Sequence, residues 1–336
     1  MKKRLADQVV VVSGASSGIG RATARLLAER GAKVVVSARN AGALDAAVAE
    51  IEARGSEGLA VPGDASSEVD AESLCARAVE RFGRIDTFVA AVMVTVYAEA
   101  EQLEHAELAR VLDVNFLGRV RAYRAALPHL RATRGTFVDV NSGLAYRGIP
   151  LQAAYCASKA AGRAYFESAR VEQEKHGTGV DVCLVLPGGI DTPQFDRGRT
   201  TLGLRPRPVA PVYRPEVVAR VIAFCAERPQ RELPVTWAAQ KLLWGQKLSP
   251  RAGDLVLRRN GWEGQTTGEP KPPDAPDNLW ETIPGDPGAH GRFGAEARGS
   301  SAWTEARLRL GKAGAAALAT GSVLALIRYH GRTKRR

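Results

Sequence analysis

Short runs of β-branched and other apolar residues recur along the first 236 positions of the chain. Each run is almost continuously apolar and does not alternate with polar residues, which is the pattern of strands that are covered on both faces. Strands of this kind belong to parallel sheets. The seven predicted strands are residues 9–12, 33–37, 58–62, 85–91, 136–141, 180–186 and 232–236.

Between these runs lie longer segments whose apolar residues are spaced three and four positions apart, as in amphipathic helices. The six predicted helices are residues 19–30, 41–53, 67–82, 104–130, 153–176 and 215–227. Strand and helix therefore alternate along the chain. This order predicts an α/β fold with a doubly wound, mostly parallel seven-stranded Rossmann sheet and helices on both of its faces.

The pattern changes after residue 236. A further helix is predicted over residues 237–248, and the Pro-, Gly- and Asp-rich residues 264–300 predict a loop or linker. We therefore expect three parts. They are a Rossmann-fold domain over residues 1–255, a Pro/Gly-rich linker or docking segment over 256–300, and a basic C-terminal tail over 301–336.

The tail contains an uncharged run of mostly small residues at 313–327. As a helix this run is about 22 Å long, which is shorter than the hydrocarbon core of a membrane at about 30 Å. A helix that packs on the body or frays is therefore favoured over contact with a membrane. Peripheral membrane association through the basic flank, residues 328–336, stays open as the alternative.

The net charge of +11 is concentrated in the same tail. Residues 298–336 hold nine Lys or Arg and one acid, so eight of the eleven net charges lie there. The basic tail would be the only indication of a nucleic-acid partner, and we do not expect such a partner.

The four cysteines are widely spaced, which predicts free buried thiols and no metal site. The first apolar stretch is too short for a signal peptide, so a cytoplasmic protein is expected.

The first predicted strand runs directly into a glycine-rich turn that opens a helix. Three glycines let the backbone turn sharply and approach a pyrophosphate, whose charge the helix N-terminus stabilises. The position of the turn, between the first strand and the first helix of a βαβ series, favours dinucleotide binding over a plain turn. The expected contacts are Gly14, Ser16, Ser17, Gly18, Ile19 and Gly20.

Residues at the end of the second strand determine whether NAD or NADP is preferred. A carboxylate there would bind the 2′-hydroxyl of NAD, whereas an arginine pairs with the 2′-phosphate of NADP. Ala38 offers no carboxylate and Arg39 offers a guanidinium, so NADP is preferred over NAD. A solvated surface position and stacking over the adenine are the alternatives for Arg39. Asp64 is expected to take the adenine amino group, with a loop-capping role as the alternative.

The residues for catalysis are spread over three predicted elements. Tyr155 and Lys159 stand four apart at the start of a helix, so their side chains share one face. This pair alone is a weak signal. Ser142 at the end of a strand, Asn115 within a helix and a Pro-Gly turn at Pro187 strengthen it.

With these motifs in this order, residues 5–236 resemble the short-chain dehydrogenase/reductase family. The family's glycine motif falls on Gly14, Gly18 and Gly20, and its Ser, Tyr and Lys fall on Ser142, Tyr155 and Lys159. The resemblance implies an oxidoreductase in which Asn115 orders a water beside Lys159 and Ser142 holds the substrate oxygen. The resemblance also implies further cofactor contacts from Ala91, Tyr155, Lys159, Pro187, Gly188, Ile190 and Thr192.

In that chemistry Tyr155 exchanges a proton with the substrate oxygen. A phenol has a pKa of about 10, and bringing it to about 7–8 requires roughly 3–4 kcal/mol. One ammonium at about 4 Å supplies on the order of 4 kcal/mol at an effective dielectric of 20. We therefore expect Lys159 and the positive nicotinamide to lower the pKa of Tyr155 without deep burial, and without a metal.

One segment departs from the family pattern. Where the family usually has Asn-Asn-Ala-Gly after the fourth strand, this chain has Ala90, Ala91, Val92 and Met93. The departure motivates an alternative function, a non-catalytic dinucleotide-binding or scaffold protein of the same fold. We interpret it as subfamily variation, because Ser142, Tyr155 and Lys159 are all present.

The expected substrate is a small secondary alcohol or ketone. Five residues of the later segments hint at an apolar ligand, although packing in the core is the favoured role for most of them: Leu202, Leu204, Trp237, Leu242 and Trp244. The resemblance also implies a homodimer or homotetramer that pairs through the helices carrying Asn115 and Tyr155.

Overall fold

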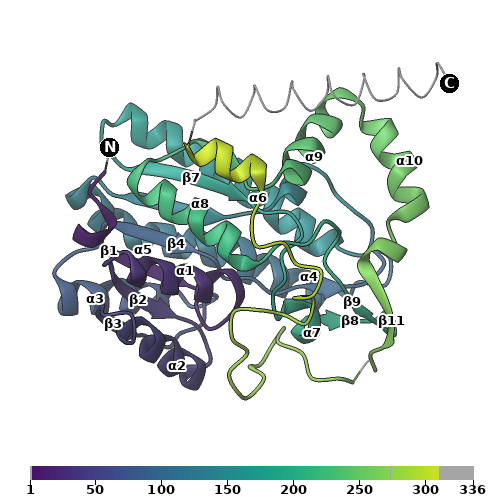
Figure 1. The fold of residues 1–336 in the computed structure, drawn as a ribbon, viewed down its shortest axis with the longest axis horizontal. Coiled ribbons are helices and arrows are strands. Elements are labelled where there is room, and N and C mark those ends of the chain that lie inside the picture. Colours follow the sequence, from purple (N-terminus) through teal and green to yellow (C-terminus); the bar gives the residue numbers. More distant parts are fainter. Residues whose placement is uncertain (1, 273, 310–336) are drawn as a thin grey trace.

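A seven-stranded parallel sheet forms the centre of the molecule (Figure 1). The computed structural model describes residues 2–272 and 274–309. The strands are β1 (Val9–Ser13), β2 (Lys33–Ser37), β3 (Gly58–Ala60), β4 (Thr87–Ala90), β6 (Thr136–Val140), β7 (Asp181–Leu186) and β10 (Glu232–Pro234). Their order across the sheet is β10-β7-β6-β4-β1-β2-β3, which is the doubly wound Rossmann topology. The predicted fold class is therefore confirmed.

Helices cover both faces of this sheet. They include α1 (Gly18–Glu29), α2 (Ala41–Glu52), α3 (Glu68–Phe82), α4 (His105–Leu112), α5 (Gly118–Thr133), α6 (Ala153–Lys175), α8 (Pro215–Glu227) and α9 (Trp237–Leu248). One core cluster joins the sheet to α1, α2 and α8, and a second joins its other face to α3, α5 and α6. Because both faces are covered, the strands can be mostly apolar, as their sequences are.

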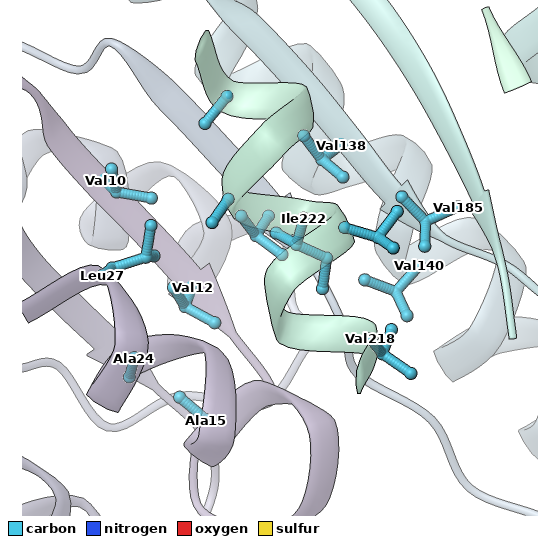
Figure 2. Packing of buried hydrophobic residues seen from close by; sticks show 14 of the residues in the cluster. Val10, Val12, Ala15, Ala24, Leu27, Val138, Val140, Val185, Val218 and Ile222 are labelled. Atoms are coloured by element: carbon cyan, nitrogen blue, oxygen red, sulfur yellow. The ribbon is translucent and has the colours of Figure 1, made fainter. Parts of the chain in front are cut away.

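Valine side chains predominate on the face of the inner strands that α1 and α8 cover. Val10, Val12, Val138 and Val140 all point into the cluster that surrounds Ile222 of α8 (Figure 2). β-branched side chains pack well on a pleated surface, which is why they predominate here. Burial of this layer holds the first βαβ unit against the rest of the sheet and so fixes the turn between β1 and α1.

The long helix predicted over residues 104–130 is interrupted. It consists of α4, a π-helical turn at Asp113–Leu117, and α5. The start of α5 packs closely on a neighbouring loop, because a Cβ on Gly118 would lie 2.7 Å from the carbonyl oxygen of Ala65. Single π turns are rare and often occur at functional sites. This one carries Asn115.

Within the described residues, the chain after β10 packs on the Rossmann body. The helix α9 is followed by α10 (Pro250–Asn260), so the domain boundary expected at residue 255 falls inside a helix. Within the predicted loop 264–300, β11 (Thr266–Pro270) pairs with β9 (Leu204–Pro206). Two further short strands, β5 (Val96–Tyr97) and β8 (Arg199–Thr200), also pair, and α7 (Gln194–Arg197) precedes β8. The three-part division of the chain stays a prediction.

Residues 302–309 form a helix that packs back onto the sheet edge. The Thr304 hydroxyl donates to the carbonyl of Val235, and the ring of Trp303 lies 5.0 Å from that of Trp237. Trp237 also contacts Trp244, so these two tryptophans pack with Trp303. The apolar run 313–327 lies outside the described residues. Among the helices that are described, none is long and apolar enough to cross a membrane.

We predict that Ile222→Ala lowers the free energy of unfolding by about 2–4 kcal/mol, because it leaves a cavity in a fully buried cluster. Urea unfolding followed by circular dichroism measures the change. Val69→Ala, at a position that is 72% exposed, is the control and should change stability by no more than about 0.5 kcal/mol. Equal effects of the two substitutions would contradict the packing described here.

Candidate active site

The turn between β1 and α1 is shaped by glycine. Gly14 has φ +80° and Gly18 has φ +55°, both in the left-handed region that favours glycine. A Cβ on Gly20 would lie 2.2 Å from the carbonyl oxygen of Gly14, so no other residue fits there without a backbone shift. The turn therefore presents backbone at the N-terminus of α1, where an anion is stabilised by the helix dipole.

A cavity of about 190 Å³ opens at this turn. It brings together ten of the predicted cofactor contacts: Gly14, Ser16, Ser17, Gly18, Ile19, Gly20, Arg39, Asp64, Ala91 and Thr192. Within the described part of the chain, the residues that line it do not include Asn115, Ser142, Tyr155, Lys159, Pro187, Gly188 or Ile190. The cavity thus corresponds to one end of the predicted cofactor site, and the catalytic residues lie beyond it.

Arg39 and Asp64 are both at the cavity, and both already have partners. The Arg39 guanidinium donates to the carbonyls of Asn278 and Trp280, at 2.6 and 2.7 Å. The Asp64 carboxylate accepts from the backbone N–H of Ser66 at 2.9 Å and from Arg110 at 3.0 Å. The bond to Ser66 is the loop-capping role that was weighed for Asp64 as the alternative to binding adenine.

Ser142, Tyr155 and Lys159 meet at the carboxyl end of β6. Ser142 follows the strand, and Tyr155 and Lys159 lie in the first two turns of α6. The Lys159 amine donates to the carbonyl of Val140 at 2.9 Å and lies 5.4 Å from the centre of the Tyr155 ring. The Ser142 hydroxyl accepts from the N–H of Leu144 and also interacts with the Tyr155 phenol. The structure therefore places these three side chains close together, and their catalytic role stays a prediction.

The pKa values of Tyr155 and Lys159 are both shifted in the protein without a cofactor. Desolvation raises the pKa of Tyr155 to about 12, and the interaction with Ser142 opposes this only in part. Burial and the nearby Arg119 guanidinium hold the pKa of Lys159, a residue that is 2% exposed, well below its usual range. Desolvation thus disfavours both charged forms, and the acidity predicted for Tyr155 beside the bound nicotinamide stays a prediction.

Asn115 lies in the π-helical turn and is fully buried. Its amide accepts from the N–H of Val94 and donates to the carbonyl of Val94, both at 2.8 Å. A third bond reaches the Ser158 hydroxyl at 3.2 Å. The side chain thus fastens the chain after β4 to α6. The water beside Lys159 that the resemblance implies stays a prediction.

The Pro-Gly turn after β7 lies next to Ser142. The carbonyl of Pro187 accepts from the N–H of Gly143 at 3.0 Å. Gly188 is exposed, whereas Ile190 and Thr192 are buried. The Thr192 side chain faces the glycine turn between β1 and α1, here called the phosphate turn, because a Cβ on Gly18 would lie 3.2 Å from its methyl group. The turn therefore links the catalytic residues to the cavity.

The sequence profile described as short chain dehydrogenase matches residues 8–202. The chain belongs to the short-chain dehydrogenase/reductase family. It is an oxidoreductase of this family, whose members bind a nicotinamide dinucleotide and act on small molecules.

Relatives and a solved structure agree with this assignment. The chain is 36% identical to the uncharacterized oxidoreductase YxnA of Bacillus subtilis over 282 residues, which cover 83% of this chain and 79% of that one. It is 38% identical to cis-4-hydroxycyclohexanecarboxylate dehydrogenase of Sinomonas cyclohexanicum, over 67% of this chain and 92% of that one. The structure of an alcohol dehydrogenase from the archaeon Thermococcus sibiricus, complexed with 5-hydroxy-NADP, superposes with a TM-score of 0.57 and 28% identity. It covers 64% of this chain and 88% of that one.

The loop that departs from the family pattern is held by other contacts. Ala90 pairs with Asp139 across β4 and β6, and the N–H of Ala91 donates to the carbonyl of Ser13 at 2.9 Å. The loop backbone packs directly on the phosphate turn, since a Cβ on Gly14 would lie 2.6 Å from the nitrogen of Val92. Val92 and Met93 then line the cavity. The departure therefore leaves an ordered wall beside the phosphate turn.

Two site residues were missed by sequence reasoning. Arg119 and Asp139 are both 0% exposed and form an ion pair at 2.5 Å. The Arg119 guanidinium also donates to the carbonyl of Asn115, and Asp139 accepts from Asn141, whose own oxygen accepts from the N–H of Ser142. A chain of buried polar groups thus runs from the π turn to Ser142. An acid inside an apolar strand and an arginine one turn after Asn115 are the signals that could have revealed it.

We predict that Asp139→Asn lowers the free energy of unfolding by about 3–5 kcal/mol, because it leaves the buried Arg119 without a countercharge. Chemical unfolding of the purified protein measures the change. Asp254→Asn, which removes the exposed partner of Arg147, is the matched control and should cost about 1 kcal/mol or less. A loss no larger than that of the control would show that the buried pair is not needed for folding.

Proposed function

We propose that this enzyme is an NADP(H)-dependent oxidoreductase that transfers hydride between the nicotinamide and a secondary alcohol or ketone, with Tyr155 as general acid and base. The observation that carries the proposal is the meeting of Ser142, Tyr155 and Lys159 at the carboxyl end of β6. The phosphate turn lies at the same edge of the sheet. Two similar proteins, an alcohol dehydrogenase and the dehydrogenase of a hydroxycyclohexane carboxylate, support this substrate class.

The residues at the cavity fit a nicotinamide dinucleotide. The N-terminus of α1 and the glycine turn suit the pyrophosphate, and Arg39 and Asp64 lie where the adenosine end would bind. Ala91 and Thr192 continue the cavity wall toward the catalytic residues. When bound, the cofactor supplies or takes the hydride, and its oxidised ring adds a positive charge near Tyr155.

The side chains of this enzyme supply the proton and the orientation. In the proposed reduction the Ser142 hydroxyl holds the carbonyl oxygen, and the Tyr155 phenol donates its proton to that oxygen. Burial raises the pKa of Tyr155 to about 12, so the phenol is protonated near neutral pH before a cofactor binds. In the proposed oxidation of an alcohol the phenolate accepts the proton, and added positive charge would then lower the pKa of Tyr155.

Preference for NADP is proposed on Arg39. No carboxylate stands at position 38, and the Arg39 guanidinium reaches the cavity from the end of β2. A guanidinium can bind a 2′-phosphate with charge-assisted hydrogen bonds. The solved relative contains an analogue of NADP, which supports the same choice.

We also propose a cytoplasmic location and a homodimer or homotetramer that pairs through the helices near Asn115 and Tyr155. Leu117, beside the start of α5, is 41% exposed, and Val171 of α6 is 58% exposed. Exposed apolar side chains on these elements are compatible with such an interface.

We predict that Tyr155→Phe lowers the rate of NADPH oxidation at least about 100-fold over a panel of ketones, because it removes the proton donor. Absorbance at the nicotinamide band follows the reaction. Tyr165→Phe, on the same helix, is the matched control and should keep wild-type activity. A Tyr155→Phe enzyme as fast as the wild type would refute the mechanism. Wild-type protein that binds NADPH but reduces no carbonyl would favour the non-catalytic alternative.

A second prediction concerns the cofactor preference. Arg39→Ala should weaken NADPH binding about tenfold or more, and NADH binding much less, because only NADPH carries the 2′-phosphate. Fluorescence titration of each cofactor gives the dissociation constants. The two cofactors serve as controls for each other, since any indirect effect on the fold acts on both. An equal loss for NADPH and NADH would show that Arg39 does not read the phosphate.

A further inference from the structure

Residues 277–293, here called the strap, lie across the cavity at the phosphate turn. In Figure 1 the strap is the yellow-green loop between α1 and α7. Four of its residues line the same cavity as the glycine turn: Asn278, Thr282, Ile283 and Pro287. The strap lies outside residues 8–202, which match the family profile, so it is an addition made by the C-terminal extension.

One end of the strap is fastened where the adenosine is expected. The carbonyls of Asn278 and Trp280 accept both hydrogen bonds from Arg39. Beside them, the Arg110 guanidinium donates to the carbonyl of Leu279 at 3.1 Å and lies over the Trp280 ring at 5.8 Å. Leu279 itself is fully buried. This end of the strap is therefore built into the wall of the cavity.

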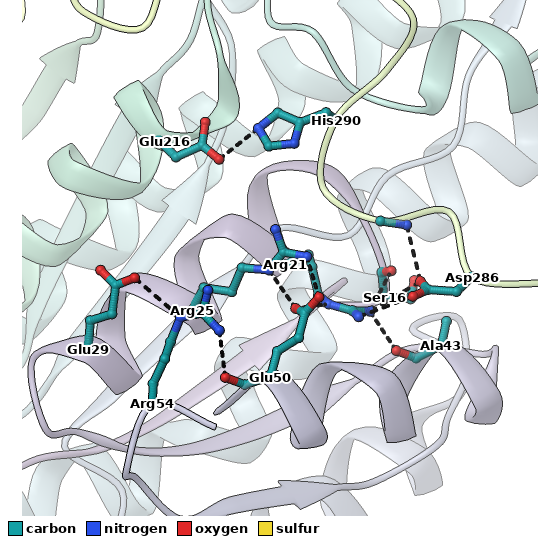
Figure 3. A network of polar contacts seen from close by, with 11 residues as sticks. Ser16, Arg21, Arg25, Glu29, Ala43, Glu50, Arg54, Glu216, Asp286 and His290 are labelled. Carbon is teal, nitrogen blue, oxygen red and sulfur yellow. Dashed lines mark hydrogen bonds and ion pairs between the residues drawn. The ribbon is translucent and has the colours of Figure 1, made fainter. Parts of the chain in front are cut away.

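The middle of the strap is fastened to the phosphate turn. The N–H of Gly18, at the first position of α1, donates to the carbonyl of Gly288 at 3.2 Å. Asp286 forms an ion pair at 3.3 Å with the buried Arg21, which also holds Glu50 at 2.7 Å (Figure 3). A strap carbonyl thus takes an amide that a pyrophosphate would otherwise use.

The far end of the strap is tied to the element that follows β7. The N–H of Phe293 donates to the fully buried Asp191 carboxylate at 3.0 Å. His290 lies 2.8 Å from Glu216 at the start of α8, as Figure 3 shows. The strap is therefore held at three places along the site, over the adenosine end, the phosphate turn and the nicotinamide side.

With the strap in this position, the end of the site at the phosphate turn is narrow, with a cavity of about 190 Å³. The strap also uses two groups that suit a dinucleotide, the N–H of Gly18 and the guanidinium of Arg39. The strap in this position therefore competes with a cofactor for these two groups.

We propose that the strap is a gate on the dinucleotide site, which detaches from Gly18 and Arg39 to admit the cofactor and then closes over it. This inference rests on the proposed function, because it assumes that the cavity takes NADPH or NADH. Its consequence is kinetic. Entry and release of either cofactor are limited by opening of the strap, so contacts that hold the strap slow both steps.

The test uses a full-length double variant, Asp286→Ala with His290→Ala. Neither residue lines the cavity, and Arg21 keeps its bonds to Glu50 and to the carbonyl of Ala43. The matched control is Asp254→Ala with His176→Ala, which removes the same two residue types at exposed positions on α10 and at the end of α6. Stopped-flow fluorescence measures the association and release rates of NADPH and NADH for the wild type and both variants.

We expect the strap variant to bind and to release both cofactors about three- to tenfold faster, while the control stays within about twofold of the wild type. Unchanged rates in a folded strap variant that binds NADPH would overturn the gate and leave the proposed function intact. A wild-type protein that binds neither cofactor would overturn the proposed function and the gate together.

Hydrogen exchange of the wild type gives a second readout that needs no variant. Amides of the strap should exchange more slowly once NADPH is bound, because the closed strap then packs on the cofactor. Strap amides whose exchange does not respond to saturating NADPH would also overturn the gate.

Discussion

The covering of the parallel sheet on both faces is the constraint on which the rest of this structure depends. Where helices bury both faces, a strand has no room for solvated polar side chains, and the chemistry has to lie where the strands end. In this enzyme the carboxyl ends of β1, β2, β6 and β7 carry the glycine turn, Arg39, Ser142 and the Pro187 turn in that order. Packing of valine against helices therefore determines where the site is, before any catalytic residue is considered.

Asp139 is a fully buried acid inside this mostly apolar sheet, and it shapes the electrostatics of the site. The buried Asp139 carboxylate lies near two buried basic side chains, Arg119 and Lys159. It forms an ion pair with Arg119. Burial, together with the neighbouring Arg119, lowers the pKa of Lys159, and the Lys159 amine donates to the carbonyl of Val140. Under the proposed function, the bound cofactor would add positive charge near Tyr155.

Most of the fold could be predicted from the sequence because its signals are local. Each strand is a short apolar run and each helix has a regular apolar period, so the alternation of the two was visible along the chain. The grouping of Ser142, Tyr155 and Lys159 was predictable for the same reason, since it follows from a strand end and a helical spacing. The observed ends of individual helices and strands differ from the predicted ends by a few residues, because backbone hydrogen bonds determine where each element ends.

The remaining features depend on contacts between distant parts of the chain, which composition and period do not show. The π turn at Asn115 divides a segment whose apolar period is that of one continuous helix. The pKa of Tyr155 depends on how much protein covers it, and sequence spacing gave the distance to a charge but not the burial. The residues 264–300 lack any period, so they were predicted as a loop or linker, although part of them docks on the phosphate turn.

Both ends of that docked segment are anchored independently of the cavity. Upstream, β11 pairs with β9, and downstream, Trp303 and Thr304 fasten the following helix to Trp237 and Val235. A lifted segment of this kind cannot diffuse away, so its effective concentration at the cavity stays high and reclosing is a unimolecular event. Because the segment is anchored at both ends, it can also gain only limited conformational entropy when it opens. A shortened protein that lacks the final anchor would reclose more slowly, even with every residue of the cavity in place.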